Sequence, residues 1–191
     1  MRKLFLIPLL FFACTETTQL DEATVEGLST LPSGAKKEPY ADNPNLVKVT
    51  IERPPGQVSE QGDYLKGKKH GTWTTYHPND LVKSITTYVN GLKQGTHVEI
   101  DDRGRLLLKA YYHNDVYDGD FVAYNQTKVI ERKFYNAGKL EGTLKKYYTD
   151  GKIMEESIYV DGKLNGIARW YDQQGNVTLE YEYQDGKLVK K

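Results

Sequence analysis

A repeat of about 24 residues limits what this chain can fold into more than any other feature of its sequence. Tyrosines recur with spacings of 24, 24, 23, 24 and 24 residues, at Tyr64, Tyr88, Tyr112, Tyr135, Tyr159 and Tyr183. A glycine follows most of these tyrosines after three residues, and another after seven. A fixed period of this length is typical of tandem arrays in which each unit packs on its neighbours. We therefore expect an array of small units.

Each unit is predicted to be a β-hairpin. Asn90-Gly91, Asp161-Gly162 and Asp185-Gly186 are pairs that adopt the positive φ angles of tight hairpin turns. In the first unit the strands are expected at residues 71–76 and 81–88, with links short enough for antiparallel neighbours. The fold class is therefore all-β: an antiparallel meander of tandem ~24-residue hairpin repeats forming an elongated twisted sheet. The same pattern allows closure into a barrel.

The third repeat lacks one residue near residues 125–128, so we expect its turn to differ. Because side chains alternate along a strand, positions at even offsets from the leading tyrosine are expected to share one face. Trp73, Phe121 and Leu144 fall at an odd offset and are assigned to the other face. The even positions include an aliphatic residue 18 places after each tyrosine: Val82, Leu106, Val129, Ile153 and Val177.

The tyrosine row itself has two interpretations. It is either the packing spine of the array, because stacked repeats must bury something regular, or a binding strip, because tyrosine offers a rigid amphipathic surface. The first interpretation is the one we adopt from the sequence.

Residues 1–13 are predicted to be a signal peptide. Arg2 and Lys3 precede an apolar run over residues 4–12, which is too short to span a bilayer. Cys14, the only cysteine of the chain, follows Ala13 directly. This arrangement resembles the lipobox of bacterial lipoproteins, in which a small residue precedes the lipidated cysteine. An ordinary signal peptide followed by an unpaired cysteine is the alternative.

Lipidation of Cys14 would anchor the protein in a membrane through its acyl chains. Thr15 follows the cysteine, at the position where aspartate is typical of lipoproteins retained in the inner membrane. The predicted location is therefore the bacterial cell envelope, on the periplasmic or surface-facing side of the outer membrane. Residues 14–45 are polar, acidic and proline-bearing, which predicts a flexible tether behind the lipid. Residues 46–63 are predicted to form a degenerate capping repeat, and residues 64–191 the array proper.

The segment from Tyr64 to Tyr76, with Gly67, Gly71 and Trp73 between them, is similar to the MORN (membrane occupation and recognition nexus) repeat in its bacterial variant. The resemblance extends over residues 64–191. It departs from the pattern at Asp115, where glycine is usual, and at other positions such as Ile100, where tyrosine is usual. The resemblance implies a binding or scaffold module. It also implies an alternative, an antitoxin-like or immunity-like protein that neutralises a partner, because the bacterial group includes toxin-antitoxin system antitoxins.

No catalytic or metal-binding constellation is expected. The neighbouring carboxylates of Glu155 and Glu156, like those of Asp101 and Asp102, would point to opposite faces of a strand and could not share a substrate. The four histidines have no metal-ligand spacing and fall where polar residues are expected: His70, His77, His97 and His113. We therefore predict a protein that is not an enzyme and uses no metal or cofactor.

Charge gives no reason to expect a nucleic acid partner, since the formal net charge is zero. The distribution is uneven, with 4 basic and 9 acidic residues at positions 15–63 and 20 basic and 17 acidic residues at positions 64–191. Lysines recur beside the glycines: Lys68, Lys69, Lys93, Lys139, Lys152, Lys163 and Lys187. They either keep turns and edges soluble or form a rim for anionic headgroups or glycans. The predicted partners are a membrane, through lipid on Cys14, and a protein.

Replacing Cys14 with serine tests the anchor. Radiolabelled palmitate should be incorporated by cells that express the wild-type chain and not by cells that express Cys14→Ser, because the thiol is the acylated group. Equal labelling of both proteins, or of neither, would remove the lipoprotein prediction.

Overall fold

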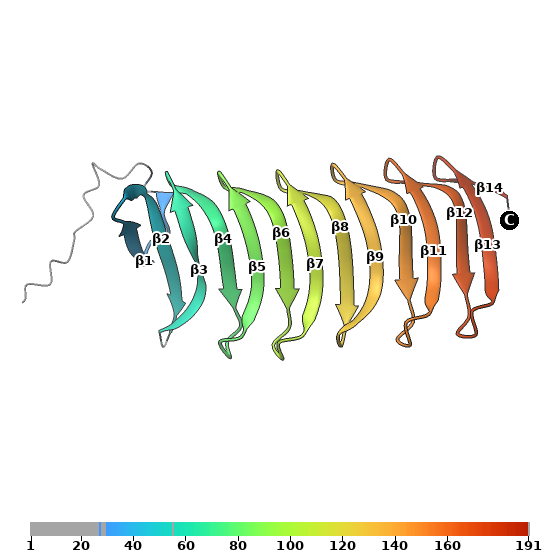
Figure 1. Ribbon diagram of the computed structural model, residues 1–191, viewed down its shortest axis with the longest axis horizontal. Coiled ribbons are helices and arrows are strands. Elements are labelled where there is room, and N and C mark those ends of the chain that lie inside the picture. Colours follow the sequence, from blue (N-terminus) through green and yellow to red (C-terminus); the bar gives the residue numbers. More distant parts are fainter. Residues whose placement is uncertain (1–26, 28–29, 55, 191) are drawn as a thin grey trace, which may run out of the picture.

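The computed structural model describes residues 27, 30–54 and 56–190, and within them the chain forms one open sheet (Figure 1). Each of its 14 strands pairs antiparallel with the next strand in the sequence, so the order in the sheet is β1 to β14. The predicted all-β meander is confirmed. The sheet does not close into a barrel, because β1 and β14 form its two edges.

The strands β2 to β13 are of similar length and differ mainly in their place along the sheet. Their bounds are β1 Lys36–Tyr40, β2 Asn43–Arg53, β3 Gln57–Leu65, β4 Lys68–Tyr76, β5 Val82–Val89, β6 Leu92–Ile100, β7 Leu106–His113, β8 Val116–Asn125, β9 Lys128–Asn136, β10 Lys139–Tyr147, β11 Ile153–Val160, β12 Lys163–Tyr171, β13 Val177–Gln184 and β14 Lys187–Lys190.

Two kinds of turn alternate along the sheet. The upper turns, at the top of Figure 1, contain two residues with positive φ, as at Asn90 (51°) and Gly91 (89°). This confirms the predicted tight hairpins. The lower turns are longer, as where the backbone N–H of His77 donates to the carbonyl of Leu81 at 2.8 Å. In the third repeat the lower turn consists of Gln126 and Thr127, both with positive φ, which confirms the predicted difference.

A β-bulge beside each lower turn decides which face a side chain occupies. Thr75 pairs with Ser84, but Tyr76 pairs with Val82, so Lys83 is an extra residue in β5. Directly opposite residues share a face, and one extra residue reverses the alternation. Val82 therefore shares a face with Tyr76 and not with Tyr88. The face predicted for the aliphatic residues at offset 18 is wrong, since the same register recurs at Leu106, Val129, Ile153 and Val177.

The face predicted for Trp73 is wrong as well. Trp73 pairs with Thr86, two residues before Tyr88, and its ring lies 5.2 Å from the ring of Tyr64 in an edge-to-face contact. Phe121 and Leu144 lie at the equivalent position of later repeats. In antiparallel pairing, a residue at an odd offset from its leading tyrosine, such as Trp73, lies opposite a residue at an even offset in the next strand, such as Thr86. The two residues therefore share a face. We call this side, which carries all the leading tyrosines, the tyrosine face, and the other the opposite face.

A column of buried residues runs along the middle of the tyrosine face. In β4 to β7 it consists of directly paired residues, from Trp73 through Thr86 and His97 to Ala110, and it continues through Leu144, Ser157 and Ala168. Small members such as Ala110, with 0% exposure, lie between larger ones. Because the sheet has one layer, this burial comes from neighbouring side chains and not from a second layer.

The N-terminal end of the tyrosine face is covered by the chain itself. Leu31 is 6% exposed and packs in a cluster with Val47, Val49 and Trp73. The hydroxyl of Thr30 donates to the carbonyl of Gly67 at 3.0 Å. These contacts shield the apolar end of the buried column from water. They form the cap that a repeat array needs at its end.

Strand β1 and the start of β2 lie inside the segment predicted to be a flexible tether. The prediction is wrong for residues 36–45, because β1 pairs with β2 over Lys36 to Tyr40. Residues 14–26 of that segment lie outside the described residues. Residues 46–63 lie mostly in the hairpin β2–β3. Ser59 is the extra residue of a β-bulge in this hairpin, at the position of the repeat that Lys83 occupies in the next hairpin.

Gly62 is one of the positions at the capping end where the structure leaves no room for a side chain. A Cβ built there would lie 2.5 Å from the Trp73 ring. Gly62→Ala should therefore destabilise the fold by about 1–3 kcal/mol through overpacking, measured by chemical denaturation.

The matched control is the same substitution in a Trp73→Leu background. With the ring removed, the added methyl should cost less, so the double-mutant cycle should show a coupling of at least about 0.5 kcal/mol. Additive effects would show that the Gly62 contact with Trp73 is not the cause.

Candidate functional site

The predicted lipidation site, Cys14, lies outside the described residues, as does the predicted signal peptide. Among the residues that are described, no helix is long and apolar enough to span a membrane. Lipidation of Cys14 therefore stays a prediction of the sequence.

The histidines occupy different environments, and His97 is part of the buried column. Its Nδ1 lies 2.8 Å from the Thr86 hydroxyl, and its Nε2 lies 3.0 Å from Glu99 Oε1. His77 belongs to a lower turn, where its Nε2 lies 2.8 Å from the carbonyl oxygen of Ile100 in the next repeat. Both rings thus link neighbouring strands or turns. Within residues 27, 30–54 and 56–190, no three His, Cys, Asp or Glu side chains gather in a way that could hold a metal ion.

The carboxylates singled out in the sequence have structural partners. Asp101 accepts hydrogen bonds from the backbone N–H of Arg103 and Arg105 and from Nε of Arg105. The bonds from Arg105 are the main cause that lowers the pKa of Asp101 to about 2. Glu155 and Glu156 lie on opposite faces, as predicted, and pair with Lys146 at 2.8 Å and Lys145 at 2.9 Å. These groups hold a turn and cross-strand pairs in place.

Lysines on the tyrosine face lie over aromatic rings. Nζ of Lys69 is 3.9 Å from the ring centroid of Trp73, and Nζ of Lys93 is 4.8 Å from that of Tyr112. Nζ of Lys133 is 4.2 Å from that of Phe121. Cations at these distances are attracted by the ring faces. These lysines therefore take part in the packing of the face as well as in its charge.

The tyrosine row is densest between β7 and β9. The ring of Tyr117 lies 4.6 Å from that of Tyr112, 5.1 Å from that of Tyr135 and 5.3 Å from that of Phe121. The rings are half-buried, and burial raises the pKa of Tyr112. It also raises the pKa of Tyr64, Tyr88 and Tyr159. These contacts between repeats favour the packing-spine interpretation of the row.

The opposite face carries a row of exposed apolar side chains near the upper turns, which we call the apolar strip. Each lies next to a leading tyrosine in its strand or beside the turn that follows, and each is 38–45% exposed. Its members are Val89, Leu92, Val116, Phe134, Ile158 and Val160. The sequence places Phe134 and Ile158 among irregular apolar residues at odd offsets but does not identify an exposed row. A usable signal was present, since Leu92 and Val116 stand where the four other units have Lys68, Lys139, Lys163 and Lys187.

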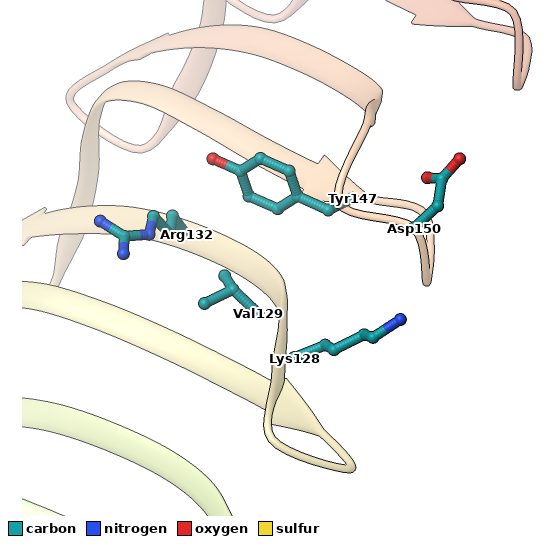
Figure 2. Close-up of a pocket in the computed structure, with 6 residues that line it drawn as sticks. Lys128, Val129, Arg132, Tyr147 and Asp150 are labelled. Carbon is teal, nitrogen blue, oxygen red and sulfur yellow. The ribbon is translucent and has the colours of Figure 1, made fainter.

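A pocket of about 460 Å³ lies on the opposite face near the lower turns, between β9 and β10 (Figure 2). Lys128, Val129 and Arg132 line it from β9, Tyr147 from β10, and residues 150–151 from the turn before β11. A smaller pocket, of about 200 Å³, lies beside His97 and Glu99. The larger pocket was not predicted, because its walls come from two repeats of different turn length.

The MORN repeat variant family matches the chain at residues 69–90, 140–161 and 164–185. These matches fall on the hairpins β4–β5, β10–β11 and β12–β13, so the predicted resemblance is confirmed there. No curated protein matches the chain.

Two solved structures share limited similarity with the chain. One is the S. aureus TarM mutant in complex with Fondaparinux, alpha-GlcNAc-glycerol and UDP, with 18% identity, a TM-score of 0.35, and coverage of 50% of this chain and 19% of that one. The other is the GtfA/B complex bound to UDP and GlcNAc, with 14% identity, a TM-score of 0.25, and coverage of 80% and 24%. The chain therefore spans less than a quarter of the length of either protein.

Tyr135 tests whether the row is a packing spine. Tyr135→Ala should destabilise the protein by about 2 kcal/mol, less than full burial would give, because the ring is only half-buried. The expected fall in Tm is about 5 °C. Tyr135→Phe keeps the ring contacts with Tyr117 and Phe121 and should change Tm little. Wild-type melting of Tyr135→Ala, combined with lost partner binding, would instead identify the row as a recognition surface.

Proposed function

We propose that this protein is a binding scaffold, a sheet of MORN-type repeats that presents the apolar strip to a protein partner. The observation that carries the proposal is the strip itself. Its side chains keep 38–45% exposure although the same chain buries comparable residues on the tyrosine face. Exposed apolar patches, unlike single exposed apolar side chains, mark interaction sites.

The composition of the strip and its surroundings supports a protein as the partner. Phe134, Ile158 and the valines can contribute about 25 cal/mol for each Å² that a partner covers. Near them the charges are partly paired, as where Lys139 meets Asp161 at 2.7 Å. An apolar centre with polar groups at its border is the usual arrangement of a protein interface. A glycan or a lipid headgroup would call for more hydrogen-bonding groups than the strip offers.

We further propose that the scaffold is anchored in the bacterial envelope by lipid on Cys14, with the array on the periplasmic or surface-facing side of the outer membrane. The support is the charged and apolar start of the sequence and the position of Cys14 after Ala13. Acyl chains on one cysteine would hold the array beside a membrane without any insertion of the sheet.

The proposed function does not include catalysis. The candidate acid and base groups, His97, Asp101 and Glu155, are each engaged by neighbours within the sheet or its turns. Their arrangement supports a structural role.

Site-specific photo-crosslinking in native cells tests the proposal. A benzophenone side chain placed at residue 134 or 158 of the full chain should give one discrete protein adduct, identified by mass spectrometry. Leu179 is the matched control, because it is 47% exposed but lies on the tyrosine face. It should give no such adduct.

An adduct of equal yield at all three positions, or at Leu179 alone, would contradict the proposal. So would adducts to lipid or glycan without protein. In a second measurement, Phe134→Ser should reduce capture of the identified partner at least tenfold while Tm stays near that of the wild type, since this ring is 44% exposed.

A further inference from the structure

We propose that the pocket between β9 and β10 binds a small organic carboxylate, with the carboxylate on the guanidinium of Arg132 and the carbon body against Val129 and the ring of Tyr147. The proposal concerns a small ligand near the lower turns. The apolar strip lies near the upper turns, at the other end of the strands, so the two sites can be tested separately.

The pocket lies beside a lower turn that is shorter than its neighbours. The lower turns are tied to the next repeat by side chains, as where the Asn79 side chain donates to the carbonyl of Asp102 and Tyr148 donates to the carbonyl of Tyr171, both at 2.6 Å. The third repeat turns with only Gln126 and Thr127. The longer turn after β10 lines the other side of the pocket through residues 150–151.

Arg132 brings an uncompensated positive charge into this space. It lies on the opposite face, where its cross-strand neighbours are Val122 and Lys145. Lys145 is already held by Glu156 at 2.9 Å, and hydrogen bonding to Glu156 is the main cause that raises the pKa of Lys145. Throughout the part of the chain that the structure describes, the side chain of Arg132 makes no hydrogen bond or ion pair. An unpaired guanidinium offers a planar fork of donors that matches a carboxylate.

The other charged residues of the pocket are engaged elsewhere. Nζ of Lys128 donates to the carbonyl of Thr149 at 2.5 Å. Asp150 accepts from the backbone N–H of Lys152 at 3.1 Å, and the Lys152 ammonium lies 3.8 Å from its other oxygen. In Figure 2, Lys128 and Asp150 lie toward the turns, away from the guanidinium of Arg132. The anionic group of the pocket therefore does not occupy the place beside Arg132.

Tyr147 and Val129 give the site its apolar side. Figure 2 shows the Tyr147 ring and the Arg132 side chain extending in the same direction, with Val129 below both in this view. The Tyr147 hydroxyl has no hydrogen-bond partner among the described residues, so it is available as a second donor. An inorganic anion would use only these donors. A carboxylate attached to a ring or chain would also cover the Tyr147 ring and the Val129 methyl groups, and a volume of about 460 Å³ accommodates such a molecule.

Titration of the full chain, followed by amide chemical shifts in nuclear magnetic resonance, tests the proposal. The probes are benzoate, an aromatic carboxylate; glucuronate, an acidic sugar; and inorganic phosphate, an anion without a carbon body. Shifts should be confined to residues 126–132 and 147–152, and at least one carboxylate should bind at least tenfold more tightly than phosphate. Comparison of the two carboxylates then tells which kind of carbon body fits.

Arg132→Gln should weaken carboxylate binding at least tenfold, and Arg132→Lys should fall between Gln and wild type because it keeps the charge without the fork. The matched control is Arg169→Gln, which removes another arginine of the opposite face, one that is paired with Glu180 at 2.7 Å. It should bind as the wild type does. Tm should not change for either Arg132 variant, since Arg132 has no partner to lose.

The proposal would be overturned by wild-type affinity in Arg132→Gln, by equal weakening in Arg169→Gln, or by phosphate binding as tightly as both carboxylates. Shifts spread over lysines outside the pocket would overturn it as well, because they would report general attraction of anions. None of these outcomes would contradict the proposed protein-binding role of the apolar strip, because the crosslinking experiment tests that role independently.

Discussion

Pairing of each strand with its sequence neighbour is the constraint on which the rest of this structure depends. The sheet has one layer, so a strand can bury apolar surface only against the strands beside it. A single hairpin is marginal in water, and stability therefore accumulates along the array. The buried column from Trp73 to Ala168 contributes to this stability, with Leu31 covering its first member and the half-buried Phe121 and Lys133 between Ala110 and Leu144.

An array of this kind must deal with its two ends, and here they differ. At the N-terminal end, Leu31 and strand β1 cover Val47, Val49 and Trp73, and Gly62 leaves the space that the Trp73 ring needs. Pro39 and three charged residues in β1 make that edge a poor template for pairing with another chain. At the C-terminal end, Leu179 and Leu188 remain about half exposed. Stability is therefore expected to be greatest near the covered end.

The two faces of the sheet differ in how their side chains are packed. On the tyrosine face, rings and lysine ammonium groups pack along the sheet, as between Lys133 and Phe121. Much of the aromatic surface of this face is therefore covered by contacts between repeats. On the opposite face, the bulge pairs Tyr147 with Ile153, and apolar side chains such as Phe134 and Val160 stay 44% exposed. The apolar strip and the Arg132 pocket both lie there. A sheet that is stabilised from one side leaves its other side free for recognition.

The sequence by itself determined the repeat period, the all-β fold, the strand positions and the tight turns, because Asn-Gly and Asp-Gly pairs act through local backbone conformation. It also predicted the different turn of the third repeat. It did not determine the faces. A single extra residue such as Lys83 reverses the alternation, and only cross-strand register reveals it. The tertiary structure likewise decided the cap, in which Leu31 meets Trp73 across 42 residues of chain, and the pocket, whose walls come from separate repeats. Contacts between distant segments set these features, and no local pattern encodes them.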